Sequence, residues 1–294
     1  MTYEEAFNAW IGEKSLAVSN STAYTYKKDA KNALEFFNGQ DISNISRENI
    51  VEFLKSEKEK KYLNSTIRIH FRCVKSVFEW LYNSEKISEN PCKNIELPAK
   101  IYREINPFSQ EEVEKLLNTP APAWVHDAVE IAYRTGMRKG EIFALKWSDI
   151  DFENGFLQVR RTQSVYAGKM EIKEPKTKSS KRKILIDKHL IELLQRRASC
   201  SGSEFVFSTK NGTPKVPHDL SCKRFKALCI RAGVKPRRFH DLRHTHASVL
   251  LSAGVHPKIV QERLGHASIK TTLDIYSHLL PSIQGAAVDV FNAL

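Results

Sequence analysis

The sequence lacks long apolar runs, paired cysteines and an excess of acidic residues, and each absence excludes a class of protein. No stretch of the 294 residues approaches the roughly 18 consecutive apolar positions that a membrane-spanning helix needs, so we expect no contact with a membrane. The first residues, MTYEEAFNAW, carry acids and no basic n-region, which argues against a secretory signal and favours a cytoplasmic protein. The five cysteines are scattered without a CxxC pair, so neither a disulfide framework nor a cysteine zinc site is expected.

Acidic residues are outnumbered by basic ones, and the excess of basic charge is concentrated in one part of the chain. The formal net charge is +12. Residues 1–100 hold 15 Lys+Arg against 14 Asp+Glu, a net of +1, whereas the rest hold 31 against 20, a net of +11. The composition, with 41% hydrophobic and 27% charged residues, is typical of a folded globular protein. The charge distribution predicts that the second part of the chain binds a polyanion.

Residues 3–84 have apolar side chains at helical spacing. Four short amphipathic helices are expected there, packed as one small bundle. The last of them carries Arg68, Arg72 and Lys75 on one face, where they would either lie along DNA phosphates or form a solvated helix surface. An Asn-Pro step and a Leu-Pro step then interrupt the helical pattern, which predicts a linker over residues 89–106.

The second part of the chain combines helical patterns with a short region of β-strand pattern. Between Trp147 and Ile186 the apolar period changes to two, which predicts three short strands and a basic hairpin over residues 173–182. The predicted fold is mainly α with a small antiparallel β-sheet, arranged as an N-terminal helical bundle followed by a mixed α+β domain. The strands are expected at Ile150–Phe152, Phe156–Val159 and Lys183–Ile186.

Arginines, histidines and a tyrosine gather in four short motifs of the second part. Arginine presents a planar fork of donors that fits two phosphate oxygens, and histidine donates or moves a proton near neutral pH. Tyrosine can attack and form a covalent intermediate. Together these residue types indicate chemistry on a phosphate. The motifs are TGMRKGE with Arg138, HDLRHTH with His240 and Arg243, LGH with His266, and DIYSHL with Tyr276.

In the order and spacing of these motifs the chain resembles the tyrosine recombinases, also called phage integrases. The resemblance implies a metal- and ATP-independent enzyme without a cofactor, which cuts and rejoins double-stranded DNA through a 3′-phosphotyrosine intermediate. It implies that Arg138 and Arg243 hold the scissile phosphate and that His266 adds a further donor to it. Tyr276 would attack the phosphorus atom, and His240 would take or steer the tyrosine proton.

The resemblance also implies a proton donor for the leaving oxygen, supplied by a lysine of the basic hairpin. Lys176 matches best, and Lys178 is the alternative. Glu141, three residues after the first motif arginine, would either hold that arginine in place or lie exposed beside a lysine. His244 and His246 are expected to be structural or surface residues. A zinc site built on these histidines is not expected, because no glutamate or cysteine is suitably placed.

The resemblance divides the chain into residues 1–88 as a helical DNA-binding domain, the linker 89–106, residues 107–281 as the catalytic domain, and a tail helix at 282–294. The tail is apolar on alternate turns and would dock between protomers of a homotetramer on core recombination sites, or pack on its own protomer. Many integrases carry an arm-binding domain before the helical one, and its absence here either puts directional integration with arm sites in question or indicates a truncated or simpler enzyme.

Integration and excision of a mobile element is the expected function, with an accessory directionality factor among the candidate partners. The basic hairpin and the sequence LGHASIKTTLDIYSHL resemble integrases of Gram-positive phages and conjugative elements. Two alternatives stay open. One is a Xer-like resolvase of chromosome or plasmid dimers, which uses the same chemistry. The other is a DNA-binding protein without catalysis, which would bind DNA without leaving nicked intermediates.

Overall fold

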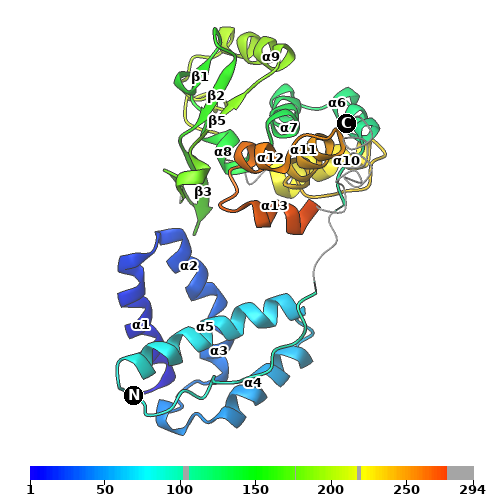
Figure 1. Cartoon of the computed structure of the whole chain (residues 1–294). Helices are drawn as coiled ribbons and strands as arrows, with labels where there is room; N and C mark the ends of the chain where they lie inside the picture. The colour runs from blue at the N-terminus through cyan, green and yellow to red at the C-terminus, as the bar shows by residue number, and fades with distance from the viewer. Residues whose placement is uncertain (102–105, 176, 217–219, 277–294) are drawn as a thin grey trace, which may run out of the picture. The chain divides into compact units, whose positions relative to one another are not determined.

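The structure is a computed structural model that describes residues 1–101, 106–175, 177–216 and 220–276, with side chains 178, 221, 222 and 275 left out. The chain divides into two compact units, Met1–Arg103 and Glu104–Leu294. Figure 1 shows both units, with labels on most of their helices and strands. No helix in the described ranges is long and apolar enough to cross a membrane.

The first unit is a bundle of helices that pack on α5. This helix contacts every other α-helix of residues 1–101, and its apolar face is buried from Ile67 to Leu81. The core is rich in aromatic rings: the Tyr3 ring centroid lies 5.0 Å from that of Phe37 and 5.9 Å from that of Phe78. The expected N-terminal helical bundle is therefore confirmed. Its helices are α1 (Tyr3–Ala17), α2 (Asn20–Asp29), α3 (Lys31–Phe36), α4 (Arg47–Glu59) and α5 (Asn64–Asn83).

The second expected helix of this bundle is two helices, α2 and α3, with the junction at Ala30. Neither proline nor glycine marks the junction, so the local sequence contains no helix breaker there. Ala30 is fully buried, and both α2 and α3 contact α5. The break between α2 and α3 therefore follows from tertiary packing around Ala30 and not from low intrinsic helix propensity.

Residues 90–99, expected within the linker, lie on the first unit. Cys92 is buried, and Arg47 donates a hydrogen bond to the Asn94 carbonyl oxygen (3.1 Å). At the start of α5, Asn64 donates to the Ala99 carbonyl (3.1 Å) and Arg68 donates to the Pro98 carbonyl (3.0 Å). Arg68, the first residue of the expected basic stripe, therefore holds a backbone segment of its own unit.

The second unit surrounds one apolar core with helices and a small three-stranded sheet. Helix α11 packs on α7, and α12 and α13 contact each other and α11 (Figure 1). The first of its described helices, α6, has Ser109 as its N-cap, and Ser109 and Glu112 form a capping box. The α-helices described here are α6 (Gln110–Asn118), α7 (Ala123–Thr135), α8 (Lys139–Phe143), α9 (Lys188–Ser199), α10 (Phe225–Arg231), α11 (Asp241–Ser252), α12 (Pro257–Leu264) and α13 (Ile269–Tyr276).

The small antiparallel sheet is confirmed, with strand order β1-β2-β5 (Ile150–Asp151, Phe156–Val159, Arg182–Leu185). A separate two-stranded ribbon, β3 (Thr162–Tyr166) with β4 (Lys169–Lys173), was not expected from the sequence. Its turn places Ala167 (φ +47°) and Gly168 (φ +74°) in the left-handed region, as two-residue hairpin turns of this hand require. The expected basic hairpin over residues 173–182 is instead the connection from β4 to β5, with a short helical turn at Lys178–Ser180.

Candidate active site

Arg138 is presented at the start of α8, where its own backbone fixes the acid that binds it. Its backbone N–H and its Nη1 donate to the two oxygens of the Glu141 carboxylate, at 2.8 and 2.9 Å. Glu141 is 2% exposed, whereas the Arg138 side chain is 38% exposed. Of the two roles expected for Glu141, the structure confirms that it holds the motif arginine.

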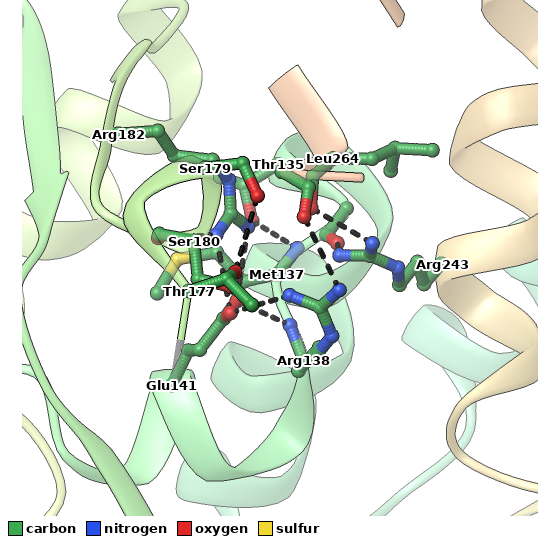
Figure 2. A network of polar contacts seen from close by, with 12 residues as sticks. Thr135, Met137, Arg138, Glu141, Thr177, Ser179, Ser180, Arg182, Arg243 and Leu264 are labelled. Carbon is green, nitrogen blue, oxygen red and sulfur yellow. Dashed lines mark hydrogen bonds and ion pairs between the residues drawn. The ribbon is translucent and has the colours of Figure 1, made fainter. Parts of the chain in front are cut away.

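A second arginine, Arg182 on β5, completes the shell around the same carboxylate. Its Nη1 and Nη2 donate to the Glu141 oxygens at 3.1 and 2.9 Å, and its Nε donates to the Arg263 carbonyl at 2.7 Å. Burial alone would raise the pKa of the Glu141 carboxyl, but the hydrogen bonds and charges of Arg182 and Arg138 lower it below its ordinary value. Glu141 is therefore ionised, and Figure 2 shows both guanidiniums around it.

Arg243 is the most deeply buried charge of the motif set, at 3% exposure. Its Nη1 donates to the Gly136 carbonyl (2.7 Å) and its Nη2 to the Leu264 carbonyl (2.8 Å). Gly136 caps α7 at φ +67°, and a Cβ there would lie 2.7 Å from both His246 Cδ2 and Leu264 Cδ2. Two neutral carbonyls thus fix the guanidinium plane without neutralising its charge.

Arg138 and Arg243 meet at one turn of the chain, the end of α12. Arg243 binds the Leu264 carbonyl, and Arg138 Nη2 lies 3.4 Å from the next carbonyl, that of Gly265. Figure 2 shows the two guanidiniums next to each other, both facing the turn at Leu264. Burial lowers the pKa of Arg243 to about 9, helped by the nearby charges of Arg138 and Arg182, so it still carries its proton at neutral pH. With Glu141, the three guanidiniums leave a net charge of +2, which an anion such as phosphate would offset.

Tyr276, the last residue of α13, is 1% exposed and its ring packs among Ala247, Leu251, Val260 and Leu264. Its hydroxyl lies 2.5 Å from Nδ1 of His244. Burial raises the pKa of the phenol well above its ordinary value, although the charge of Arg243 opposes this shift. The phenol is therefore protonated at neutral pH, and it lies close enough to Arg243 for that charge to act on it.

The phenol contacts a different histidine from the one expected. The resemblance implied that His240 takes or steers the tyrosine proton, whereas the hydroxyl contacts His244, and the His240 ring packs edge-on against His244 with 5.2 Å between the ring centroids. Burial, followed by the charges of His244, Arg243 and Arg138, lowers the pKa of His240 to about 4. His244, expected as a structural or surface residue, is the histidine in direct contact with the tyrosine hydroxyl.

His266 follows the turn to which both arginines bind. Its Nδ1 lies 2.9 Å from the Thr272 hydroxyl of α13, which fixes the ring between the turn and the helix that ends in Tyr276. Burial, and then the charges of Arg243, Arg138 and Arg182, lowers the pKa of His266 to about 3. The ring is therefore neutral and able to donate one hydrogen bond without adding to the positive charge.

The neutral histidines of this site predict an acid-sensitive fold. His240 and His266 have folded pKa values of about 4 and 3, below the unfolded value of 6.5. Between pH 6.5 and about 4 the unfolded chain binds protons that the folded chain does not, so the free energy of unfolding falls as the pH falls. We expect a lower melting temperature at pH 5.5 than at pH 7.5, measured by thermal melts.

A His240→Gln variant serves as the control for this pH dependence. Because glutamine does not titrate, its melting temperature should fall less between pH 7.5 and pH 5.5 than that of the wild type. An unchanged pH slope in the variant, or a melting temperature that rises on acidification, would contradict the assignment of a buried neutral imidazole.

The Arg182–Glu141 pair predicts a large stability cost when only one partner is removed. Arg182→Met leaves a carboxylate that is 2% exposed with fewer donors, and breaking a buried pair in this way costs about 3 kcal/mol or more. Adding Glu141→Gln should recover part of that loss, because the unpaired charge is gone. Urea unfolding of the wild type, both single variants and the double variant measures the coupling.

Lys181→Met is the matched control, one residue from Arg182 in the same basic run. Lys181 pairs with Glu174 at 2.7 Å, but both side chains are more than half exposed, so its removal should change the free energy of unfolding by less than about 1 kcal/mol. Equal losses in Lys181→Met and Arg182→Met would show that the burial of Arg182 has no energetic consequence.

The expected leaving-group acid, Lys176, lies outside the described residues, and so does the side chain of Lys178. The turn that contains Lys178 touches the site, because a Cβ on Gly265 would lie 2.8 Å from the Ser179 carbonyl oxygen. Within this turn the Thr177 hydroxyl lies 2.8 Å from that of Ser180. The assignment of Lys176 or Lys178 stays a prediction.

Two residues of the site, Arg182 and His244, were not predicted from the sequence. Arg182 was included in an ordinary basic run, although its strand neighbours alternate, and Ile184, two positions on, is buried. The period of two along β5 was the available signal. His244 lies four residues after His240, on the same helix face, which was the signal for its contact. Among the described residues, no group of three or more His, Cys, Asp or Glu side chains could hold a metal ion.

Comparison with protein families and curated proteins gives matches over most of the chain. The model of the phage integrase family matches residues 106–282, and that of the phage integrase N-terminal SAM-like domain matches residues 11–85. The ICEBs1 integrase of Bacillus subtilis is 29% identical over 90% of this chain and 75% of its own length. A XerC-like tyrosine recombinase of Caldanaerobacter subterraneus is 32% identical over 87% and 73%, and tyrosine recombinase XerC of Natranaerobius thermophilus is 31% identical over 96% and 94%.

Solved structures with the same fold cover both units. The Tn1549 transposon integrase, solved in complex with transposon right end DNA, superimposes with a TM-score of 0.84 over 99% of each chain at 24% identity. A lambda integrase tetramer bound to a Holliday junction gives a TM-score of 0.72 over 91% of this chain and 78% of that one, at 19% identity. These similarities confirm the predicted mainly α fold with small antiparallel sheets.

Proposed function

This chain belongs to the phage integrase family, and from that premise we propose a site-specific DNA recombinase that cuts and rejoins strands through Tyr276. The observation that supports it most is the meeting of Arg138 and Arg243 at consecutive carbonyls of one turn, with the buried phenol of Tyr276 within the electrostatic influence of Arg243. A tetrahedral phosphate bound there would take donors from both guanidiniums within reach of a tyrosine oxygen.

The proposed reaction starts when the Tyr276 oxygen attacks the scissile phosphorus atom. A bond forms between that oxygen and phosphorus, and the bond from phosphorus to the 5′ oxygen of the next nucleotide breaks. Charge that builds on the non-bridging oxygens is met by Arg138 and Arg243, whose positions are set before DNA binds. Donors fixed in advance in this way stabilise a transition state more than flexible ones.

The remaining roles follow from the same site. His266 would add a donor to the phosphate, and Lys176, or Lys178 as the alternative, would give a proton to the departing 5′ oxygen. His240 would support the histidine that touches the phenol, since its ring packs on His244. The phosphotyrosine keeps the energy of the broken phosphodiester, so rejoining to a second strand consumes no ATP.

The partner proposed for this enzyme is double-stranded DNA, bound by both units. The second unit carries most of the excess basic charge, with a net of +11 beyond residue 100. Because a lambda integrase with this fold forms a tetramer on a Holliday junction, we extend four-copy assembly to this chain. The tail 282–294, a candidate for docking between copies, lies outside the described residues. An accessory directionality factor and action in the cytoplasm belong to the same proposal.

Integration and excision of a mobile element is the preferred role, and a Xer-like resolvase is the second candidate. The ICEBs1 and Tn1549 integrases favour the first role, whereas the similarity to XerC over 94% of that protein favours the second. The two differ in substrate: an integrase joins two dissimilar sites, and a dimer resolvase joins two copies of one site. Recombination of paired plasmid substrates of each kind distinguishes them.

Covalent trapping tests the proposed chemistry. DNA sites are first recovered from a randomised pool of duplexes by binding to the protein. Each recovered duplex is then prepared with a nick close to the cut position. Cleavage releases a short fragment that carries the 5′ hydroxyl, and because this fragment diffuses away, rejoining stops. We expect an adduct that survives denaturing electrophoresis. After proteolysis, the peptide linked to DNA should be the one that contains Tyr276. Binding without an adduct on any recovered duplex would favour a DNA-binding protein without catalysis, and a link to another residue would reject Tyr276 as nucleophile.

A further inference from the structure

The Tyr276 hydroxyl has a defined proton acceptor in the structure. His244 lies on α11, four residues after His240, and its Nδ1 is 2.5 Å from that hydroxyl. The two rings lie 5.8 Å apart between centroids, in a tilted arrangement. Tyr276 is buried and His244 is half-buried, and the Ser248 hydroxyl donates to the His244 carbonyl at 2.9 Å within the helix. The contact therefore lies inside a packed helix–helix interface.

The protonation states of the two groups suit a transfer from oxygen to nitrogen. Burial lowers the pKa of His244, and the charges of Arg238 and Arg243 act in the same direction, whereas Asp241 opposes them. A neutral imidazole can accept at Nδ1 while Nε2 carries its proton, which makes the phenol the donor. Since burial raises the pKa of Tyr276, loss of the phenol proton without an acceptor would be slow at neutral pH.

We propose that His244 is the general base that takes the Tyr276 proton as the phenol oxygen attacks phosphorus. This inference rests on the proposed recombinase function. In the cleavage step the O–H bond of Tyr276 breaks and its proton moves to Nδ1 of His244, while the new bond to phosphorus forms. The 5′ oxygen that leaves takes its proton from the hairpin lysine. In the rejoining step a 5′ hydroxyl attacks phosphorus and gives its proton back to the hairpin lysine. The bond from phosphorus to the Tyr276 oxygen breaks and His244 returns its proton to the phenol, so the enzyme is regenerated.

The charged groups around His244 determine how readily its imidazole accepts a proton. Asp241, three residues earlier on α11, is the acidic group that favours protonation, and it is paired with Arg238 at 2.9 Å. Arg243 disfavours protonation, but the phosphate it would bind offsets its charge. His240 packs edge-on and carries a pKa of about 4, so it stays neutral. His244 can therefore become a stronger base once DNA occupies the site.

His244→Asn tests the proposal, because the asparagine side chain can keep a hydrogen bond to the phenol but cannot accept its proton. We expect single-turnover adduct formation to slow about a hundredfold, the usual contribution of a positioned base, with unchanged DNA affinity. Replacing Tyr276 by a fluorinated tyrosine of lower phenol pKa should recover about tenfold of that loss. A merely structural role for His244 would give no such recovery.

A substrate with sulfur in place of the leaving 5′ oxygen separates the base from the acid. Sulfur leaves without a proton, so this substrate should restore Lys176→Ala but not His244→Asn. His246→Gln is the matched control: this buried histidine of the same helix binds the Tyr133 carbonyl (2.7 Å) and Arg263. It should lower the melting temperature without changing adduct formation by the folded protein.

Several outcomes overturn the inference. A wild-type rate in folded His244→Asn would remove the base role, and recovery by the sulfur substrate alone would move His244 to the leaving group. If His244→Asn unfolds, the pH dependence of the cleavage rate is measured with His244 in place. The rate is compared between tyrosine and fluorinated tyrosine at position 276. If the pKa on the acidic side of the profile falls with the phenol pKa, a histidine base is excluded. Absence of any adduct with the wild type overturns the recombinase function as well, so the two failures are distinguishable.

Discussion

A Tyr276→Phe protein should bind its DNA site as the wild type does and form no detectable covalent adduct. Phenylalanine keeps the ring that packs on Leu251 and Leu264, but it removes the only atom of the side chain that can bond to phosphorus. It also leaves His244 Nδ1 without the hydroxyl that lies 2.5 Å away. Loss of a partner from a buried polar atom costs about 1–3 kcal/mol, so the melting temperature should fall slightly while DNA binding persists.

Tyr3→Phe is the matched control for this prediction. Tyr3 is also a fully buried tyrosine, but it lies in the first unit, and its hydroxyl has no hydrogen-bond partner among the residues that the structure describes. Removing that hydroxyl should leave the stability unchanged or raise it, and the adduct should form at the wild-type rate. Adduct formation by Tyr276→Phe at the wild-type rate would reject Tyr276 as the nucleophile, whatever the stability of the variant.

The motifs predicted which residues meet, but not the device that brings them together. Arg138 and Arg243 are 105 positions apart, and their common partner is the turn at Leu264 and Gly265. Gly136 and Gly265 cap α7 and α12 with positive φ, as glycine commonly does at the end of a helix. That the carbonyls freed at these caps are the ones Arg243 and Arg138 bind depends on how α7, α11 and α12 pack, which a local pattern does not encode.

Burial of charge was the least predictable feature of the site. Lys181, Arg182 and Lys183 are adjacent and all basic, yet only the middle one of the three makes contacts to Glu141. Composition treats such a run as solvated, and the pleat of β5 decides which member turns inward. Likewise, a histidine beside a motif arginine is an ordinary helix residue until α13 brings a phenol to it. These contacts are tertiary, and the sequence contains only their periodicity.

Arg243→Lys should reduce single-turnover cleavage about a thousandfold, the scale set by a well-placed arginine in phosphoryl transfer. The guanidinium of Arg243 uses Nη1 and Nη2 on two carbonyls in different helix caps, and its planar fork still directs further N–H groups to a ligand. An ammonium is a single point and cannot hold both carbonyls and a phosphate at once. Because the positive charge is kept, DNA affinity should change far less than the cleavage rate.

A scissile methylphosphonate, which lacks one negative charge, tells whether Arg243 acts on the phosphate or only on the fold. If it meets the charge of a non-bridging oxygen, Arg243→Ala should regain cleavage on the neutral substrate relative to the ordinary one. Arg263→Lys is the control, since Arg263 also donates to two carbonyls, those of Leu185 and Arg134, both at 2.9 Å. It should lose stability and show no preference for the neutral substrate. The same preference in both variants would mean that the carbonyl contacts, and not a phosphate contact, explain the need for Arg243.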